Sequence, residues 1–267
     1  MTMTDPRPTG RDGDRPLPAN FRFVRVRSVV PVGRAFLRVT FEGDDLSNHG
    51  DRAIHFRLVL PPPGTAEPVW PTVGATGGIA WPEGSAAPHR PVYSARRVDH
   101  ADHTLDMDVF LHDGGRTTAW AQALQRDEPG ARRRVGIVGP AGGGLLQTDR
   151  ALIASDETGF PAAARLLENL PPSATGTVLL ESEHGAACAY PIDTPAGFST
   201  KWLHRARGER LDEATIAALP EHDDATVWFA GERQQATRVR EAALGRGREK
   251  TDLRISGFWR AAPMDER

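Results

Sequence analysis

Cysteine is nearly absent from this sequence of 267 residues, which contains Cys188 alone. A single thiol excludes an internal disulfide and a cysteine-based zinc or iron–sulfur site. The neighbours of Cys188 are alanines and a tyrosine, which supply no base or cation to activate a thiolate. We therefore interpret Cys188 as a small buried apolar residue rather than a nucleophile.

Long apolar runs and an excess of one charge are also missing. No run reaches the roughly 18 apolar residues that a membrane-spanning helix requires. Residues 1–20 are rich in proline, aspartate, arginine and glycine, and they lack the apolar segment of a signal peptide. The formal net charge of -2 favours neither nucleic acid nor an anionic membrane as a partner. We therefore predict a disordered tail over residues 1–18 and a cytoplasmic protein, expected to be a monomer.

Short strands separated by turn residues characterise the first half of the chain. Residues 21–27 alternate apolar and charged side chains, as a half-buried strand does. A Gly/Pro-rich loop follows the third strand, and a helix with Thr117 or Thr118 as its N-cap precedes the last one. The expected elements are strands at 21–27, 36–41, 54–60, 92–98, 104–111 and 134–138, and the helix at 117–125. Six such strands predict a small antiparallel β-barrel.

The second half alternates strands and helices, which predicts a parallel α/β sheet. The change of pattern falls near residues 139–149, where Gly142–Gly144 make a natural hinge. The fold class is therefore β followed by α/β, with domains over residues 19–144 and 150–262. Strands are expected at 151–154, 177–181, 226–230 and 253–256, helices at 162–170, 212–219 and 234–244, and a looser segment at 182–210.

Tyr93 and Ser94 lie in a basic stretch that runs from Arg90 to Arg97. An aromatic ring can stack on a flavin, a hydroxyl can donate to a ring nitrogen, and an arginine can bind a diphosphate with two parallel hydrogen bonds. The alternative is a basic edge strand whose charges only deter aggregation. The spacing alone leaves both interpretations open.

Gly114 and Gly115 precede the predicted helix, and two threonines follow them. Backbone N–H groups at a helix start attract a phosphate, and glycines allow it to approach closely. The alternative is an ordinary turn and helix cap, because Gly-Gly turns are common.

Asp156, Glu157 and Thr158 follow the apolar strand at 151–154. Ligands of α/β domains bind at the carboxyl ends of such strands. The G-x-G-x-x-G pattern of the common dinucleotide site is absent, and capping of the next helix is the alternative role for the acidic residues.

In their order along the chain, these motifs resemble the siderophore-interacting branch of the ferredoxin–NADP reductase superfamily. The similar segments are Tyr93–Arg96, Leu111-His112, Gly115–Trp120, Gly139-Pro140, Asp156–Ala162, Trp202–Arg205, Ala230–Glu232 and Gly257–Arg260. Arg90 stands three residues before Tyr93, whereas the family arginine stands two before, so either Arg90 or Arg96 is the motif arginine. Phe258 replaces the usual tyrosine.

The resemblance implies an FAD-binding barrel over residues 19–144 and an NAD(P)H-binding domain over residues 150–262. It implies an NAD(P)H-dependent flavoprotein reductase that passes electrons from NADPH or NADH through FAD to a ferric siderophore. This chemistry requires no protein acid, base or metal ligand, so no catalytic residue and no metal site are expected. The implied cofactor-binding residues are Arg90, Tyr93, Ser94, Arg96, His112, Gly115, Thr117, Thr118, Asp156, Glu157, Thr158, Gly231, Glu232 and Trp259.

The resemblance leaves the substrate and the electron donor open. An anionic ferric siderophore would meet basic side chains, for which the candidates are Arg97, Lys201, His204 and Arg205. A ribose 2′-phosphate would require an arginine, for which the candidates are Arg205, Arg233 and Arg238. In this superfamily a C-terminal aromatic residue such as Trp259 can lie near the flavin, and packing of the tail is its alternative role. A ferredoxin-dependent relative and a non-catalytic flavin- or siderophore-binding protein are the competing functions.

Overall fold

The structure is a computed structural model that describes residues 16–128 and 131–261. The chain forms two compact units. The first contains residues up to 29, residues 39–107 and residues 113–144, and the second contains residues 30–38, residues 108–112 and the chain from residue 145 on. Cys188 is buried, as predicted. Among the described residues, no helix combines the length and hydropathy needed to cross a membrane.

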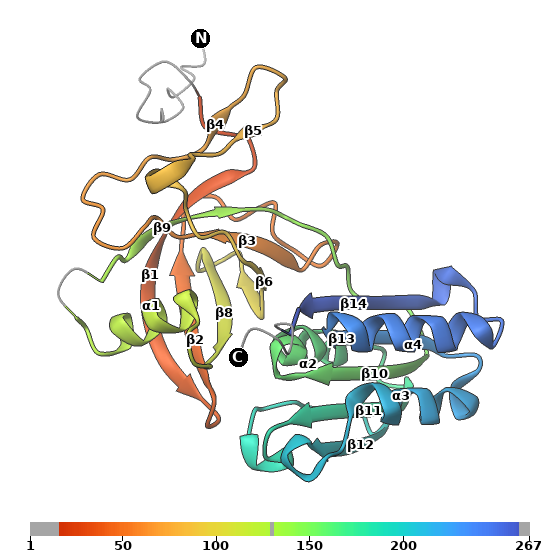
Figure 1. Ribbon diagram of the computed structural model, residues 1–267. Coiled ribbons are helices and arrows are strands. Elements are labelled where there is room, and N and C mark those ends of the chain that lie inside the picture. The colour runs from red at the N-terminus through yellow and green to blue at the C-terminus, as the bar shows by residue number, and fades with distance from the viewer. Residues whose placement is uncertain (1–15, 129–130, 262–267) are drawn as a thin grey trace. The chain divides into compact units, whose positions relative to one another are not determined.

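Seven strands form the antiparallel sheet of the N-terminal part (Figure 1). Alternation in the first strand is as predicted, because Val24 and Val26 are buried while Arg25 and Arg27 are exposed. The strands are β1 (Phe21–Val32), β2 (Phe36–Glu42), β3 (His55–Val59), β6 (Val92–Ser94), β7 (Arg97–Asp99), β8 (Thr104–Phe110) and β9 (Arg134–Val138). Their hydrogen-bonded order is β6-β3-β9-β1-β2-β8-β7.

The sheet closes into a barrel where residues 92–98, predicted as one strand, divide into β6 and β7. β6 pairs with β3 and β7 pairs with β8, at the two ends of the strand order. The amide of Ala95 donates to the carbonyl of Ile54, and the amide of Arg96 donates to the carbonyl of Asp106, both at 2.8 Å. The chain thus crosses from one edge partner to the other, which accounts for seven strands where six were predicted.

The loop after β3 carries a small hairpin of β4 (Thr72–Val73) and β5 (Ile79–Ala80). The amide of Val73 donates to the carbonyl of Pro16 at 2.9 Å, and Leu17 packs with Phe21 and Val138. Residues 16–18 of the predicted tail therefore contact the barrel. The rest of that tail and residue 262 of the predicted second domain lie outside the described residues.

A five-stranded parallel sheet forms the core of the second unit, with the order β12-β11-β10-β13-β14. Its strands are β10 (Arg150–Asp156), β11 (Thr175–Ser182), β12 (Gly197–His204), β13 (Thr226–Glu232) and β14 (Leu253–Trp259). The helices of the chain are α1 (Arg116–Gln125), α2 (Phe160–Glu168), α3 (Leu211–Ala218) and α4 (Arg233–Gly245). Each predicted helix is present, with its ends shifted by no more than a turn.

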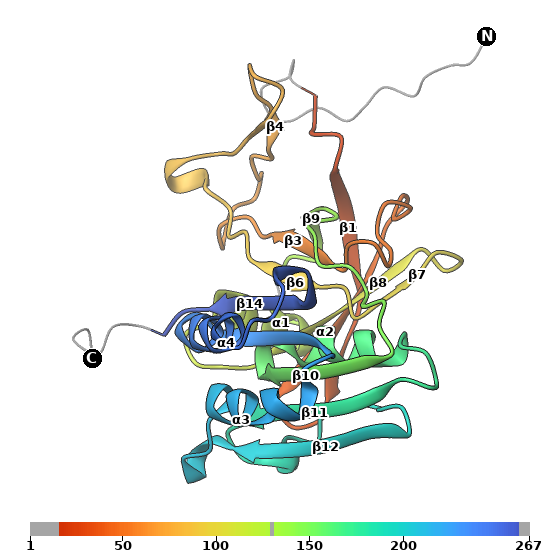
Figure 2. The ribbon, with the colours of Figure 1, turned by 90° about the vertical axis from the view of Figure 1, so that its right-hand side faces the viewer.

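The connections of this sheet change direction at β10. From β10 the chain moves outward through α2 to β11 and β12, and then returns past β10 to β13 and β14 through α3 and α4. Because such crossovers are right-handed, α2 covers one face while α3 and α4 share the other. Figure 2 shows α3 and α4 side by side, where Leu152, Val227 and Phe229 pack against them. The boundary between β10 and β13 is therefore the switch point at which such sheets bind ligands.

β12 is the strand of the parallel sheet that the sequence prediction missed, because residues 182–210 were expected to be irregular. All of its residues pair with β11, from Gly197 opposite Thr175 to His204 opposite Ser182. It is an edge strand with exposed Ser199, Thr200 and Lys201, and only Leu203 is fully buried. A strand with so few buried side chains produces little apolar alternation to detect.

The second unit also includes the β1–β2 turn and the end of β8, which the predicted boundary assigns to the barrel. Phe36 packs on Phe160 and Tyr190, with ring centroids 6.1 and 4.5 Å away. The Tyr190 hydroxyl donates to the buried carboxylate of Asp108 at 2.5 Å, and Arg38 pairs with the same carboxylate at 2.7 Å. This aromatic and ionic cluster explains why those residues group with the second half of the chain.

Candidate functional site

Tyr93 on β6 lies beside the start of α1, as the sequence motifs predict. Its phenol is hydrogen-bonded to Thr117, and burial raises the pKa of the Tyr93 hydroxyl. The Thr117 hydroxyl also lies 3.2 Å from Nε2 of His89. Burial, followed by the charge of Arg116, lowers the pKa of His89, so its ring is neutral at neutral pH. The Thr117 hydroxyl thus connects β6, the loop before β6 and α1.

Ser94 turns away from this cluster, as alternation along a strand requires. Its hydroxyl lies 3.0 Å from Nδ1 of His55 on β3. His55 also lies against Gly143, where a Cβ would approach the imidazole to 2.3 Å. The amides of Ile54 and His55 donate to the carbonyls of Gly143 and Gly142, so the glycines of the predicted hinge run beside β3.

The start of α1 differs from the prediction in its cap. Gly115, with an extended backbone, is the N-cap, and a glycine has no side chain with which to cap the helix. Thr117 and Thr118, predicted as caps, lie inside the helix and are buried. The preceding Gly114 has φ +74°, which glycine adopts without strain. The backbone N–H groups at this helix start are donors of the kind that bind an anion.

A basic cavity of about 550 Å³ lies next to this helix start. It is lined by Arg57, Arg90 and Arg116, together with His89 and Trp81. The Arg90 guanidinium stacks 4.4 Å above the Trp81 ring, and Arg57 donates to the carbonyl of Arg90 at 2.6 Å. Arg90 therefore lies in this cavity, whereas Arg96, the other candidate for the motif arginine, is not among its lining residues.

The donors of this region fit the diphosphate of FAD. Three guanidinium groups and a helix start provide charge-assisted hydrogen bonds to phosphate oxygens. The Tyr93 ring, on the adjoining strand, is an aromatic surface with a protonated hydroxyl. The residues present are thus those that a flavin dinucleotide requires.

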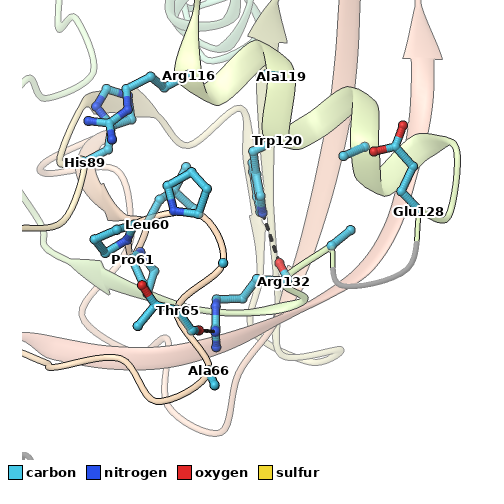
Figure 3. Close-up of a pocket in the computed structure, with 15 residues that line it drawn as sticks. Leu60, Pro61, Thr65, Ala66, His89, Arg116, Ala119, Trp120, Glu128 and Arg132 are labelled. Carbon is cyan, nitrogen blue, oxygen red and sulfur yellow. Dashed lines mark hydrogen bonds between the residues drawn. The ribbon is translucent and has the colours of Figure 1, made fainter. Parts of the chain in front are cut away.

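A second cavity, of about 660 Å³, lies along α1 (Figure 3). Ala119, Trp120 and Ala123 contribute from the helix, and the loop from Leu60 to Ala66 faces them. Trp120 donates its indole N–H to the carbonyl of Arg132 at 3.0 Å, as the dashed line in Figure 3 shows. His89 and Arg116 line this cavity as well as the basic one.

Asp156 ends β10, and Gly231 lies one residue before the end of β13, at the switch point of the second unit. One carboxylate oxygen of Asp156 accepts from the Thr158 amide at 2.9 Å and from the Thr158 hydroxyl at 2.5 Å. Gly231 lies so close that a Cβ there would approach the other oxygen to 3.2 Å. Glu232 caps α4 by accepting from the amides of Gln234 and Gln235. The capping roles considered for the acidic residues are therefore present, at the edge where a dinucleotide would bind.

Trp259 joins this group through its indole N–H, which donates to Oδ2 of Asp156 at 2.6 Å. Asp156 is 1% exposed, and Trp259 is 41% exposed. Burial raises the pKa of Asp156 to about 6, while the bonds from Thr158 and Trp259 lower it. Trp259 thus combines a specific hydrogen bond with an exposed ring.

Arg205, predicted as a substrate or phosphate ligand, is surrounded by carboxylates. Its guanidinium pairs with Glu157 and lies 3.3 Å from the carboxylates of Glu181 and Glu183. Burial raises the pKa of Glu181 to about 7, although Arg205 lowers it. The Arg205 guanidinium therefore has protein partners on several sides. Of the 2′-phosphate candidates, Arg238 is also paired, with Asp212 at 2.6 Å, and Arg233 is exposed at the first residue of α4.

The remaining substrate candidates are divided between the two units. Arg97 belongs to the first unit and pairs with Asp99 at 3.0 Å. Lys201 and His204 lie on β12 in the second unit, where Lys201 is exposed and the His204 ring contacts His184. His112, predicted as a cofactor ligand, also belongs to the second unit and contacts Phe110, whereas Gly115 belongs to the first. Within the described residues, no group of three histidine, cysteine or carboxylate side chains is arranged to hold a metal ion.

Four residues that line these two cavities were not among the predicted cofactor ligands. They are Arg57, His89, Arg116 and Trp120. Arg116 was the most accessible to prediction, because a cation directly after Gly114-Gly115 stands at the expected phosphate turn. Trp120 falls within the similar segment Gly115–Trp120 but was given no role of its own. Arg57 and His89 come from other parts of the chain, so no local pattern reveals them.

An antiparallel barrel with a helix before its last strand, followed by a parallel sheet with its switch point at Asp156, is the fold of the ferredoxin–NADP reductase type. The profile of the siderophore-interacting FAD-binding domain matches residues 25–144, and that of the siderophore-interacting protein matches residues 148–262. The chain belongs to the siderophore-interacting protein family.

Characterised relatives cover nearly the whole chain. The NADPH-dependent ferric-chelate reductase of Escherichia coli is 31% identical over 90% of this chain and 93% of its own. The ferric vibriobactin reductase of Vibrio cholerae is 26% identical over 95% of this chain and 93% of its own. Among solved structures, a siderophore utilization protein from T. fusca is 29% identical, with a TM-score of 0.76 over 94% of this chain and 96% of its own.

Proposed function

We propose that this protein reduces chelated Fe(III) with electrons from NAD(P)H that pass through FAD. The observation that carries the proposal is the cluster of Tyr93, Thr117 and His89 beside a cavity lined by three arginines. This cluster lies in the part of the chain that matches the family's FAD-binding domain. The relatives named as ferric-chelate and ferric vibriobactin reductases support the same reaction class.

The proposal assigns the two cofactors to the two halves of the chain. Residues 19–144 would bind FAD, and residues 150–262 would bind NAD(P)H, in agreement with the family matches at 25–144 and 148–262. The proposed FAD ligands are Arg90, Tyr93, Ser94, Gly115, Thr117 and Thr118, with Arg96 and His112 retained as weaker candidates. The proposed NAD(P)H ligands are Asp156, Glu157, Thr158, Gly231, Glu232 and Trp259.

FAD, when bound, accepts a hydride from NAD(P)H and passes its electrons on one at a time. One NAD(P)H therefore reduces two Fe(III) ions to Fe(II), with release of NAD(P)⁺ and one proton. Fe(II) binds hard oxygen donors more weakly than Fe(III) does, so the chelator releases the iron. This reaction needs no proton transfer from a protein acid or base.

The protein's own contribution is to bind and orient. The phenol of Tyr93 stays protonated because burial raises its pKa, so it can donate as well as stack. The arginines of the basic cavity neutralise the diphosphate. Arg97 and Lys201 are exposed cations that would attract an anionic chelate from solution. A cytoplasmic location and a monomeric state remain parts of this proposal.

An anaerobic titration tests the proposed function. The purified protein, loaded with FAD, is mixed with NADPH or NADH, and the visible flavin spectrum is recorded. Loss of the yellow absorbance, followed by its return on addition of a ferric catecholate, hydroxamate or citrate complex, is the expected result. Trapped Fe(II) is quantified in the same reaction, and about two ions per NAD(P)H are expected from the electron balance.

The competing functions give different results in this titration. A flavin that stays oxidised with both nicotinamides but is reduced by ferredoxin indicates the ferredoxin-dependent form. A flavin that no donor reduces indicates a binding protein without turnover. Protein that remains colourless with excess FAD overturns the proposal.

A further inference from the structure

We propose that His55 is a positioning residue: its Nδ1–H donates to the hydroxyl oxygen of Ser94, so that the Ser94 proton stays available for an acceptor atom of the flavin ring. The inference rests on the proposed function, because Ser94 is one of the FAD ligands proposed there. It is carried by the bond between the two side chains, by the tight seat of the imidazole and by the orientation of Ser94 away from the Tyr93 cluster.

His55 and Ser94 face each other across two paired strands. His55 begins β3, Ser94 ends β6, and the two residues are direct partners in the antiparallel ladder. Side chains at such positions have Cβ atoms about 5 Å apart. Nδ1 of His55 accordingly lies 3.0 Å from Oγ of Ser94. Ser94 is only 6% exposed, so water competes little for this hydrogen bond. The register of the sheet therefore brings the two side chains together.

The direction of this hydrogen bond decides what Ser94 can offer a ligand. The distance of 3.0 Å allows either atom to be the donor. If Ser94 donates to Nδ1, its oxygen can only accept from a ligand. If Nδ1–H donates to Oγ, the hydroxyl keeps its one proton for another acceptor. The unprotonated ring nitrogens of an oxidised flavin are acceptors, so the second arrangement is the one that suits them.

The imidazole of His55 is seated on the glycine segment that follows β9. The His55 amide donates to the Gly142 carbonyl at 3.1 Å, and the Ala141 amide donates to the His55 carbonyl at 2.7 Å. A Cβ at Gly143 would lie 2.3 Å from Cδ2 and 2.4 Å from Nε2 of the ring, whereas a Cβ at Gly142 would meet no atom within 4 Å. The position of the ring therefore depends on the missing side chain at Gly143.

Ser94 requires a partner of its own because its neighbour is oriented from the other side of the strand. The Tyr93 phenol is hydrogen-bonded to Thr117 at the start of α1. Since successive side chains of a strand point to opposite faces, Thr117 cannot orient Ser94 as well. His55 supplies that orientation from β3. A hydroxyl that is already directed loses less rotational freedom when a ligand binds.

Two adjacent glycines provide a matched pair of variants. Gly142 and Gly143 have φ values of +95° and +67°, so an alanine is strained at either position. Only Gly143→Ala also displaces the His55 ring. FAD is titrated into each full-length flavin-free protein, and binding is followed by flavin fluorescence. We expect Gly143→Ala to bind FAD about two- to tenfold more weakly than Gly142→Ala, which is the range of one hydrogen bond. Equal affinities of the two variants overturn the inference.

Substitutions of His55 separate the donor from a purely structural role. His55→Leu removes the donor, and His55→Asn keeps an amide N–H on a side chain that branches at the same carbon. The leucine should weaken FAD and shift the visible flavin band, and the asparagine should restore both. In a Ser94→Ala background the leucine should change neither, because His55 acts through the Ser94 hydroxyl. An equally large effect of the leucine in that background shows a structural role and overturns the inference.

The proton on the His55 ring can be observed directly. A ¹⁵N NMR spectrum of the full-length protein, labelled at histidine and assigned with His55→Asn, reports which ring nitrogen carries a proton. We expect a proton on Nδ1 both without and with FAD. An unprotonated Nδ1 means that Ser94 donates to it, and overturns the inference. These outcomes differ from failure of the proposed function, in which the unsubstituted protein binds no flavin at all.

Discussion

The indole N–H of Trp259 donates to Oδ2 of Asp156, 2.6 Å away, across a strand that separates their own strands. β14 ends with Trp259 and β10 ends with Asp156, and β13 lies between them. A register shift between Gly231 and Glu232 puts Trp259 opposite Glu232. Because Gly231 has no side chain, the indole and the carboxylate meet above the intervening strand. A β-bulge and a glycine together direct this aromatic side chain.

The Trp259→Phe variant isolates that hydrogen bond, because the phenyl ring keeps the aromatic surface and loses the donor. A hydrogen bond to a charged group contributes about 1.5–3 kcal/mol, and 1.36 kcal/mol corresponds to about one pKa unit. The pKa of Asp156, about 6 in the unsubstituted protein, should therefore rise by about one unit or more. A ¹³C NMR titration of the Asp156 carboxyl measures it. Trp202→Phe, in the same unit, is the control, and an unchanged Asp156 titration contradicts the assignment.

Glu181 gives the second unit a pH-dependent stability. Burial raises the pKa of Glu181 from 4.5 to about 7, so the folded state binds more protons than the unfolded state between these values. The free energy of unfolding should therefore fall as the pH rises through this window. Glu181→Gln removes the titrating group, so its stability should change less between pH 5 and 7. Urea denaturation at each pH measures the free energy of unfolding. An equal dependence of this free energy on pH in the two proteins would falsify the prediction.

Much of the fold could be predicted because its signals are local. Alternation identified β1, where Val24 and Val26 alternate with arginines, and the apolar run at residues 151–154 identified β10. The division of residues 92–98 was not predictable, since it depends on Ile54 and Asp106 as distant backbone partners. β12 escaped prediction because an edge strand buries few side chains.

Residues of the candidate site could be predicted only where they belong to a sequence motif. Tyr93 and Thr117 were both predicted to bind the cofactor, and the structure brings the two side chains together. Arg205 shows the limit of such reasoning. A basic residue near His204 suggested a substrate ligand, but the carboxylates of Glu181 and Glu157 come from the ends of other elements. Only the folded chain reveals that these acidic side chains surround it.

Arg205 is therefore expected to contribute to stability. Loss of one partner from a buried ion pair costs about 3–5 kcal/mol, and partial exposure of Arg205 reduces this to about 2 kcal/mol or more. Arg205→Met should lower the denaturation midpoint accordingly. Lys201→Ala, which removes an exposed cation from β12, should change stability by no more than about 0.5 kcal/mol. The assignment fails if Arg205→Met is as stable as the unsubstituted protein and instead raises KM for the ferric chelate.

Arg233 is the residue that we expect to distinguish NADPH from NADH. Of the three arginines that the sequence offered for a ribose 2′-phosphate, Arg205 and Arg238 are paired with carboxylates. Arg233 is exposed, directly follows Glu232 at the switch point and begins α4, where the helix dipole favours an anion.

Arg233→Ala should therefore lower kcat/KM for NADPH by about tenfold and leave that for NADH nearly unchanged, since only NADPH carries the extra phosphate. Steady-state rates with both nicotinamides and one ferric chelate measure the ratio of kcat/KM for NADPH to kcat/KM for NADH. Arg238→Ala is the matched control on the same helix, because its guanidinium already pairs with Asp212 at 2.6 Å. If Arg238→Ala lowers the ratio and Arg233→Ala does not, the pair with Asp212 opens to receive the phosphate, and our assignment of Arg233 is wrong.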